Sequence, residues 1–206
     1  MEKNQQFQVK ITDYSSEGLG IGKTEGQFVW FIKDTVIGDE VIAAAKKVKK
    51  HYGFARLVKL VTPSPARETP ACPIAGPCGG CQLQQMRYSA QLRFKQEKVY
   101  NNLLRIGEVP KALLDEVFQP IVGMESPFRY RNKAQYPIRR DKSGKIIAGF
   151  YAGRTHDVIA CEDCLLGVEE NKAILNAIVT WMEDYSIDPY DEKSGEGLVR
   201  HVLCRK

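Results

Sequence analysis

The chain has 206 residues and a mass of 23.2 kDa, with 43% hydrophobic and 27% charged residues. This length allows a buried core and two small domains, and the composition excludes an intrinsically disordered protein. No apolar run approaches the roughly 18 residues of a membrane-spanning helix, and the N-terminal segment lacks the apolar core of a signal peptide. These features predict a cytoplasmic protein that does not bind a membrane.

The net charge of +5 conceals a gradient along the chain. Residues 1–156 carry a net charge of +11, residues 157–196 carry −9, and the last ten residues carry +3. A basic body beside an acidic segment predicts that one surface binds an anionic partner. Nucleic acid is favoured over a membrane surface, because no amphipathic anchor accompanies the charge.

The first third of the chain has the pattern of a small β-barrel. Short strands are expected where apolar residues alternate with polar ones or run together, at residues 7–11, 27–33, 41–48 and 52–61. Short strands at this spacing are typical of a barrel. The glycines at 18, 20 and 22 precede a turn and a strand rather than a helix, so they predict a barrel turn or bulge and not a nucleotide-binding loop.

Basic residues accumulate at the end of this region. Residues 41–67 contain seven lysines and arginines and no acidic residue. Without interleaved carboxylates, this pattern favours a surface that contacts phosphates. We assign six of these residues, called the barrel cations below, to RNA contact: Lys46, Lys47, Lys49, Lys50, Arg56 and Lys59.

The remaining elements follow from apolar periodicity. Prolines at 63, 65, 70 and 73 exclude a regular element from residues 62–81. Helices are expected at residues 88–106 and 169–185, and strands at 128–151 and 198–204. Cys204 falls in the last strand and is expected to pack in the core.

Five cysteines form two groups with metal-ligand spacing. The groups are Cys72-x5-Cys78-x2-Cys81 and Cys161-x2-Cys164. Such groups in a chain without a signal peptide favour metal ligands over disulfides. Spacing leaves two metals open. Zinc would use the pairs 78/81 and 161/164, whereas an iron–sulfur cluster would use 72, 78 and 81 with one distant cysteine.

Several segments together resemble the RumA-type RNA (uracil-C5)-methyltransferases, which act mainly on 23S ribosomal RNA. The most specific is Cys72-Pro-x4-Cys78-Gly-Gly-Cys81-Gln-Leu-Gln, which is similar to the iron–sulfur signature of that family. The resemblance covers nearly the whole chain. The other matching segments occur in the expected order: residues 37–41, 104–107, 128–133, 149–151 and 200–202.

The resemblance implies a TRAM domain, an OB-like RNA-binding barrel, and a [4Fe–4S] cluster. Its ligands would be Cys72, Cys78, Cys81 and Cys164, with Cys161 as an additional thiol. Family members bind S-adenosylmethionine in a C-terminal Rossmann-like domain, which also carries the cysteine that attacks uracil. That domain is expected to be absent, so the chain alone is expected to be non-catalytic, and no catalytic or S-adenosylmethionine-binding residue is assigned.

The expected fold class is therefore mixed β and α+β: an OB-like TRAM barrel, then an iron–sulfur-bearing α/β central domain, with the Rossmann-like methyltransferase domain absent. The helical segment would pack on the missing catalytic domain, and the central domain would be truncated. The expected divisions are the TRAM domain at 1–62, a linker and cysteine loop at 63–87, the helical segment at 88–118, and the central domain at 119–206.

A second basic group lies in the central domain. Arg129, Arg131, Asn132 and Lys133 are assigned to RNA contact, and Arg139 and Arg140 extend the group. Aromatic residues at 128, 130 and 136 interleave with it, and such residues can stack on unpaired bases. For the tyrosines at 130 and 136, a strand with a polar outer face and an aromatic inner face is the favoured alternative. The expected partner is RNA, most often ribosomal RNA in the family. The alternative is a free-standing RNA-binding module that carries iron–sulfur or zinc and has no methyltransferase activity.

Overall fold

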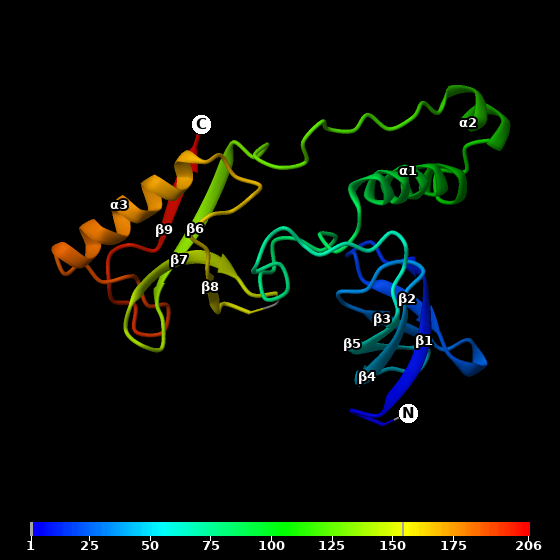
Figure 1. Ribbon diagram of the computed structural model, residues 1–206, viewed down its shortest axis with the longest axis horizontal. Helices are drawn as coiled ribbons and strands as arrows, with labels where there is room; N and C mark the ends of the chain where they lie inside the picture. Colours follow the sequence, from blue (N-terminus) through cyan, green and yellow to red (C-terminus); the bar gives the residue numbers. More distant parts are fainter. Residues whose placement is uncertain (1, 154) are drawn as a thin grey trace. The chain divides into compact units, whose positions relative to one another are not determined.

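A computed structural model describes residues 2–153 and 155–206, and the chain divides into two compact units (Figure 1). Unit 1 extends to Pro70 and also contains Gln82–Met124, and unit 2 consists of Ala71–Cys81 and Glu125–Lys206. The cysteine loop is thus separated from its flanking residues and belongs to unit 2. Each unit is described by itself below.

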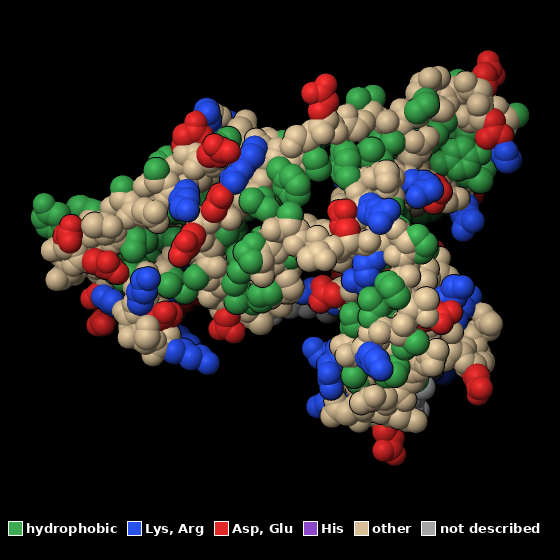
Figure 2. Space-filling model, viewed as in Figure 1, with side chains coloured by type: hydrophobic (Ala, Val, Ile, Leu, Met, Phe, Trp, Pro, Cys, Tyr) green, Lys and Arg blue, Asp and Glu red, His purple; other side chains and the backbone are tan. Residues whose placement is uncertain are grey.

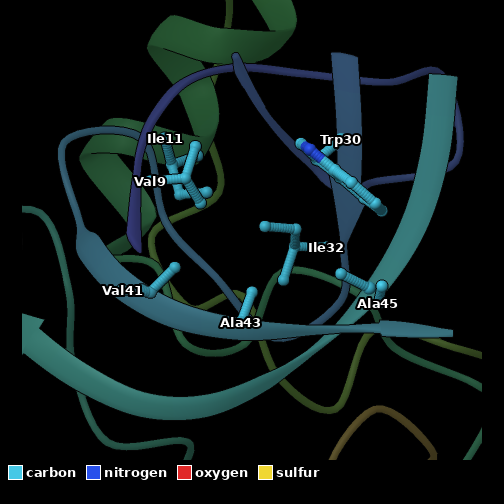
Figure 3. Close-up of a cluster of buried hydrophobic side chains, with 8 residues drawn as sticks. Val9, Ile11, Trp30, Ile32, Val41, Ala43 and Ala45 are labelled. Carbon is cyan, nitrogen blue, oxygen red and sulfur yellow. The ribbon is translucent and has the colours of Figure 1, made fainter. Parts of the chain in front are cut away.

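Unit 1 contains a closed five-stranded barrel with the strand order β1-β2-β3-β5-β4. The pair β3–β5 is parallel, and the other neighbours are antiparallel. Side chains of β1, β3 and β4 point toward one another inside it (Figure 3), among them Trp30 and Ile32 at 0% exposure. The strands are β1 (Gln6–Tyr14), β2 (Gly20–Lys23), β3 (Val29–Ile32), β4 (Glu40–Val48) and β5 (Tyr52–Thr62).

The glycines near the start of the barrel are required by close contact between strands. A Cβ atom at Gly20 would lie 2.0 Å from Oγ1 of Thr35, and one at Gly22 would lie 2.7 Å from the carbonyl oxygen of Lys10. A 3-10 turn (η1, Glu25–Gln27) and β3 follow, not a long helix. These glycines belong to the barrel as predicted, but Gly20 and Gly22 lie in strand β2 and not in a turn.

A buried carboxylate closes the barrel against the segment that follows it. Asp39 is 0% exposed and accepts hydrogen bonds from the backbone N–H groups of Val36 (2.6 Å) and Ser64 (2.9 Å). Arg67 donates to both of its carboxylate oxygens, at 3.1 and 2.5 Å, and also to the carbonyl of Asp34 at 2.9 Å. Arg67 therefore serves the fold, although it belongs to the basic run 41–67.

Two helices complete unit 1: α1 (Tyr88–Arg105) and α2 (Lys111–Val117). The helix predicted at 88–106 is confirmed, but the apolar face that predicted it lies partly in solvent. Val99 is 52% exposed and Ile106 is 78% exposed, and Figure 2 shows apolar side chains at the surface over α1 and α2. A different face, with buried Ala90 and half-buried Phe94, packs on the barrel beside Tyr14.

Unit 2 is built on a four-stranded sheet with the order β8-β7-β6-β9. Its strands are β6 (Lys133–Arg140), β7 (Ile146–Tyr151), β8 (Val158–Ala160) and β9 (His201–Arg205), and α3 (Glu170–Asp184) precedes the last of them. Leu175 and Met182 of α3 pack with the sheet, and Cys204 is buried in the same cluster at 5% exposure. The predicted packing role of Cys204 is confirmed.

The predicted α/β class is wrong for this unit. An α/β domain has parallel strands joined by crossover helices. Every strand pair of this sheet is antiparallel, and one helix serves four strands. Short hairpin connections, such as the turn at Ser143-Gly144 between β6 and β7, leave no room for a crossover helix.

None of the helices in the described residues is both long enough and apolar enough to cross a bilayer.

Candidate functional site

The barrel cations form a positively charged surface on unit 1. Lys46 and Lys47 end β4, Lys49 and Lys50 lie in the turn that follows, and Arg56 and Lys59 lie on β5. All six are exposed, and Figure 2 shows lysine and arginine side chains gathered over the barrel. Within residues 2–153 and 155–206, no ion pair involves any of the six. Their charge is therefore available to a polyanion.

The cysteine loop is attached to the sheet of unit 2 by backbone contacts. Cys78 forms a bridge with Ala152, just after β7, and the N–H group of Gly79 donates to the carbonyl of Tyr151 at 3.0 Å. A Cβ atom at Gly79 would lie 2.9 Å from that carbonyl oxygen. A glycine is thus needed where the loop meets the strand, which explains part of the Cys-Gly-Gly-Cys sequence.

The second cysteine group lies in a turn of the same unit. The N–H group of Cys161 donates to the carbonyl of Ala148 at 3.0 Å, and the carbonyl of Cys164 accepts from Gly167 at 2.9 Å. All four predicted ligands and Cys161 therefore belong to one compact unit, although about 80 residues separate the two groups.

The sulfur atoms influence one another electrostatically. Burial raises the pKa of the Cys78 thiol, and the neighbouring thiols of Cys81, Cys72 and Cys164 raise it further, whereas the N–H group of Gly80, 3.4 Å from the sulfur, lowers it. The neighbouring Cys164 sulfur and burial raise the pKa of the Cys161 thiol, whereas the proximity of Cys161 lowers that of Cys164.

Cys164 is also surrounded by donors from the backbone. The N–H groups of Leu166 and Gly167 donate to its sulfur, and the charge of Arg131 adds to their effect in lowering its pKa. Among the described residues, however, no three Cys, His, Asp or Glu side chains are placed together as a metal-binding group.

The turn that carries Cys164 is held by the segment 129–131. Arg129 donates both terminal nitrogens to the carboxylate of Asp163, at 2.6 and 2.7 Å, and one of them also to the carbonyls of Cys164 and Gly167, both at 3.2 Å. Its own backbone N–H group donates to the carbonyl of Leu165 at 2.8 Å. The guanidinium of Arg129 thus forms its hydrogen bonds with the segment 163–167 of the same unit.

The other three residues predicted to bind RNA in unit 2 lie nearby and are exposed. Arg131 donates its backbone N–H group to Leu166, which leaves its side chain at the surface beside Cys164. Asn132 accepts from the N–H group of Lys206 at 2.9 Å, and Lys133 begins β6 opposite Arg205. These residues lie together at one end of the β6–β9 strand pair.

A second ionic group in unit 2 was not recognised in the sequence. Glu192 forms ion pairs with Arg139 (2.9 Å), Arg200 (3.0 Å) and His156 (2.9 Å). Arg139 is fixed further, since it donates to the carbonyl of Tyr190 at 2.7 Å. The arginines at 139 and 200 were visible as part of basic motifs, but no sequence signal connects them with a glutamate in the acidic segment.

The pH dependence of folding is expected to include a contribution from Glu192. Hydrogen bonds from His156 and Arg200 lower the pKa of Glu192 from 4.5 to about 2. A carboxylate whose pKa is depressed by folding stabilises the protein above its unfolded pKa, and this contribution is lost as the pH falls toward the folded pKa. Urea unfolding midpoints of Glu192→Gln should therefore lie below wild type at pH 7, and the difference should vanish between pH 4.5 and 2. A difference that is constant with pH would contradict this assignment.

Residues 2–58 match the TRAM domain. Five of the six barrel cations lie inside this TRAM domain, and Lys59 directly follows it.

The whole chain also matches longer proteins. An uncharacterized RNA methyltransferase from Clostridium tetani is 40% identical over 205 residues, which cover 100% of this chain and 43% of the relative. A relative from Bacillus cereus with the same description is also 40% identical, with the same coverage. This chain therefore spans less than half the length of these curated relatives.

A solved structure shows the same fold. The crystal structure of Pyrococcus abyssi tRNA (uracil-54, C5)-methyltransferase in complex with S-adenosyl-L-homocysteine matches with a TM-score of 0.67 and 23% identity, over 96% of this chain and 42% of that one. The fold class predicted from the sequence is therefore wrong. It described the chain by an α/β domain and by the absence of a Rossmann-like domain. Nearly the whole chain follows the methyltransferase structure, with a closed barrel and a second sheet.

Proposed function

We propose that this chain is the RNA-recognition part of an S-adenosylmethionine-dependent RNA (uracil-C5)-methyltransferase of the RumA type, which acts on 23S ribosomal RNA in the cytoplasm. The observation that carries the proposal is the 40% identity to RNA methyltransferases across the full length of the chain. The TRAM match and the barrel cations, which lack carboxylate partners, support RNA as the ligand.

Discrimination between RNAs tests the substrate. The chain is expected to bind transcripts of 23S ribosomal RNA more tightly than transfer RNA at equal salt, as measured by filter binding. Equal affinity for both would contradict the ribosomal assignment, and absence of binding to either would contradict RNA recognition itself.

Salt dependence reports the contribution of the barrel cations. Each phosphate contact to a single strand contributes about 0.7 to the slope of log K against log salt concentration. Replacing both Lys49 and Lys50 by glutamine should therefore reduce the slope by about 1.4. The measurement is a fluorescence-anisotropy titration of single-stranded RNA at several salt concentrations.

A matched control uses Lys142 and Lys145, two exposed lysines at the turn between β6 and β7. Their double replacement by glutamine removes the same charge from unit 2 and is expected to leave the slope unchanged. Equal effects of both pairs would indicate a general effect of net charge instead of contact at the barrel.

We further propose that Cys72, Cys78, Cys81 and Cys164 hold a [4Fe–4S] cluster. The four thiols come from one unit, and N–H groups of Gly80, Leu166 and Gly167 point at two of the sulfurs. N–H donors of this kind tune iron–sulfur centres, which supports thiolate ligation at these two cysteines. Such a cluster would supply a covalent connection between the cysteine loop and the turn at 161–167, and its role would be structural.

The isolated chain is expected not to transfer methyl groups. The reaction at uracil C5 needs a thiol nucleophile, a base and a bound methyl donor. The proposal places these functions in the part of the relatives that this chain does not match. Incubation with labelled S-adenosylmethionine and ribosomal RNA should give no methylated uridine, and any turnover would contradict this part of the proposal.

The proposed domain division assigns residues 1–62 to RNA binding, 63–87 to the linker and cysteine loop, and 119–206 to the central domain. The segment 88–118 would pack on the catalytic domain in the complete enzyme. The exposed apolar side chains of α1 and α2 support this assignment, because contiguous exposed apolar surface commonly marks an interface.

A further inference from the structure

Three aromatic rings lie together on the outer surface of the barrel. β3 and β5 are parallel neighbours. Phe31 lies opposite Phe54, and the next residues, Ile32 and Ala55, lie opposite each other. Ile32 is 0% and Ala55 is 5% exposed, so they face the interior. Successive side chains of a strand alternate between faces, and Phe31, Phe54 and Tyr52 therefore face outward.

The three rings, called the aromatic trio below, contact one another. The ring centroids of Phe31 and Phe54 are 5.5 Å apart, those of Phe31 and Tyr52 are 5.7 Å apart, and those of Tyr52 and Phe54 are 5.8 Å apart. Tyr52 is 40% exposed, and both phenylalanines are half-buried. None of them belongs to the cluster that fills the barrel. They form an apolar surface where a barrel exposed to water would ordinarily carry polar side chains.

Trp30 fills the interior of the barrel beside the trio. Gly53 lies between Tyr52 and Phe54, and a Cβ atom there would be 2.3 Å from the ring of Trp30. Trp30 thus fills the interior against Gly53, and the residues on either side of Gly53 lie on the outer face by strand alternation.

Positive charge borders the trio. Lys47 of β4 pairs directly with Phe54 of β5, and Lys49 donates its backbone N–H group to the carbonyl of Tyr52 at 2.8 Å. The barrel cations therefore begin one strand away from the rings. Flat aromatic surface beside a row of cations is the combination that binds unpaired nucleotides, because bases stack on the rings while phosphates contact the cations.

We propose that Phe31, Tyr52 and Phe54 form a stacking site for unpaired bases of single-stranded RNA, next to the phosphate-binding barrel cations. The inference rests on the proposed RNA-binding function and adds the ligand class to it. Bases in a duplex are already stacked on one another, so the site selects single-stranded segments.

The test compares the intact 206-residue chain with the double variant Phe31→Leu/Tyr52→Leu. Leucine keeps apolar cover over the strands and removes the flat ring. Loss of base stacking is expected to weaken binding of a single-stranded RNA of about 12 nucleotides by about five- to hundredfold. The salt slope should be unchanged, because stacking displaces no counterions, and this separates the trio from the lysines.

Two controls accompany the measurement. Tyr185→Leu removes an aromatic side chain that is 71% exposed and directly follows α3, and it should bind like wild type. A duplex of the same RNA should bind the wild type and the double variant equally. Unchanged single-strand affinity in the double variant would overturn the stacking site while RNA binding by the chain persists. Absence of RNA binding by wild type would overturn the proposed function and this inference with it.

Crosslinking of the wild-type chain keeps the inference testable if the double variant does not fold. RNA that contains 5-iodouridine is expected to crosslink, on irradiation, to peptides that contain residues 29–32 or 52–55. Crosslinks confined to other peptides would overturn the stacking site.

Discussion

Asp39→Ala is expected to lower the free energy of unfolding of unit 1 by about 3–5 kcal/mol, because removing one partner of a buried ion pair leaves the other uncompensated. Asp39 is fully buried, and its carboxylate accepts from Arg67 and from the N–H groups of Val36 and Ser64. All of these donors would lose their acceptor at once, and unsatisfied buried donors are costly.

The measurement is urea unfolding followed by the fluorescence of Trp30. Trp181 of unit 2 is replaced by phenylalanine in every variant, so that the signal reports the barrel alone. Glu40→Ala is the matched control, since Glu40 is the next residue and, among residues 2–153 and 155–206, its carboxylate accepts only a long 3.4 Å hydrogen bond from Thr62. The control should change stability by less than about 0.5 kcal/mol. Similar values for Asp39→Ala and Glu40→Ala would contradict a stabilising role for the buried pair.

Cys164→Ser is expected to remove most of the iron from anaerobically purified protein, because a cluster with four thiolate ligands loses one of them. Cys161→Ser is the matched control in the same turn and should retain iron. The family resemblance assigns the fourth ligand to Cys164, and the backbone N–H groups of Leu166 and Gly167 help to lower the pKa of its thiol.

Iron analysis and visible absorbance provide the readout, and zinc is measured in the same samples. Loss of iron from the Cys161 variant alone would assign the fourth ligand to Cys161. Wild-type protein that contains zinc and no iron would replace the cluster by the two-pair zinc site. Protein without either metal would contradict the metal-binding proposal.

Local patterns predicted the elements well. The helices predicted at 88–106 and 169–185 correspond to α1 and α3. They were predictable because apolar residues recur with the 3.6-residue period of a helix. Four of the five barrel strands were likewise predicted, whereas β2 was expected to be a turn because glycines carry no strand pattern. The burial of the α1 face was not predictable in the same way, since periodicity shows that a face is apolar but not what covers it.

The arrangement of the sheet in unit 2 required the structure. Strand lengths and apolar runs do not specify whether neighbours are parallel or antiparallel, and the α/β prediction failed for this reason. Pairing between distant segments also decided the roles of individual cations. Arg129 and Lys133 look alike in a basic motif, but Arg129 holds the turn at Asp163 while Lys133 is exposed.

The sequence by itself determined the cysteine groups, the basic run of the barrel and the charge gradient, because each is a property of neighbouring residues. Only the tertiary structure brought the two cysteine groups into one unit, enclosed Asp39 with Arg67, and joined Glu192 to His156 and two arginines. It also placed Phe31 beside Phe54 through a parallel strand pair. Such contacts join residues far apart in the chain, and the long-range pairing that creates them leaves no periodic signal in the sequence.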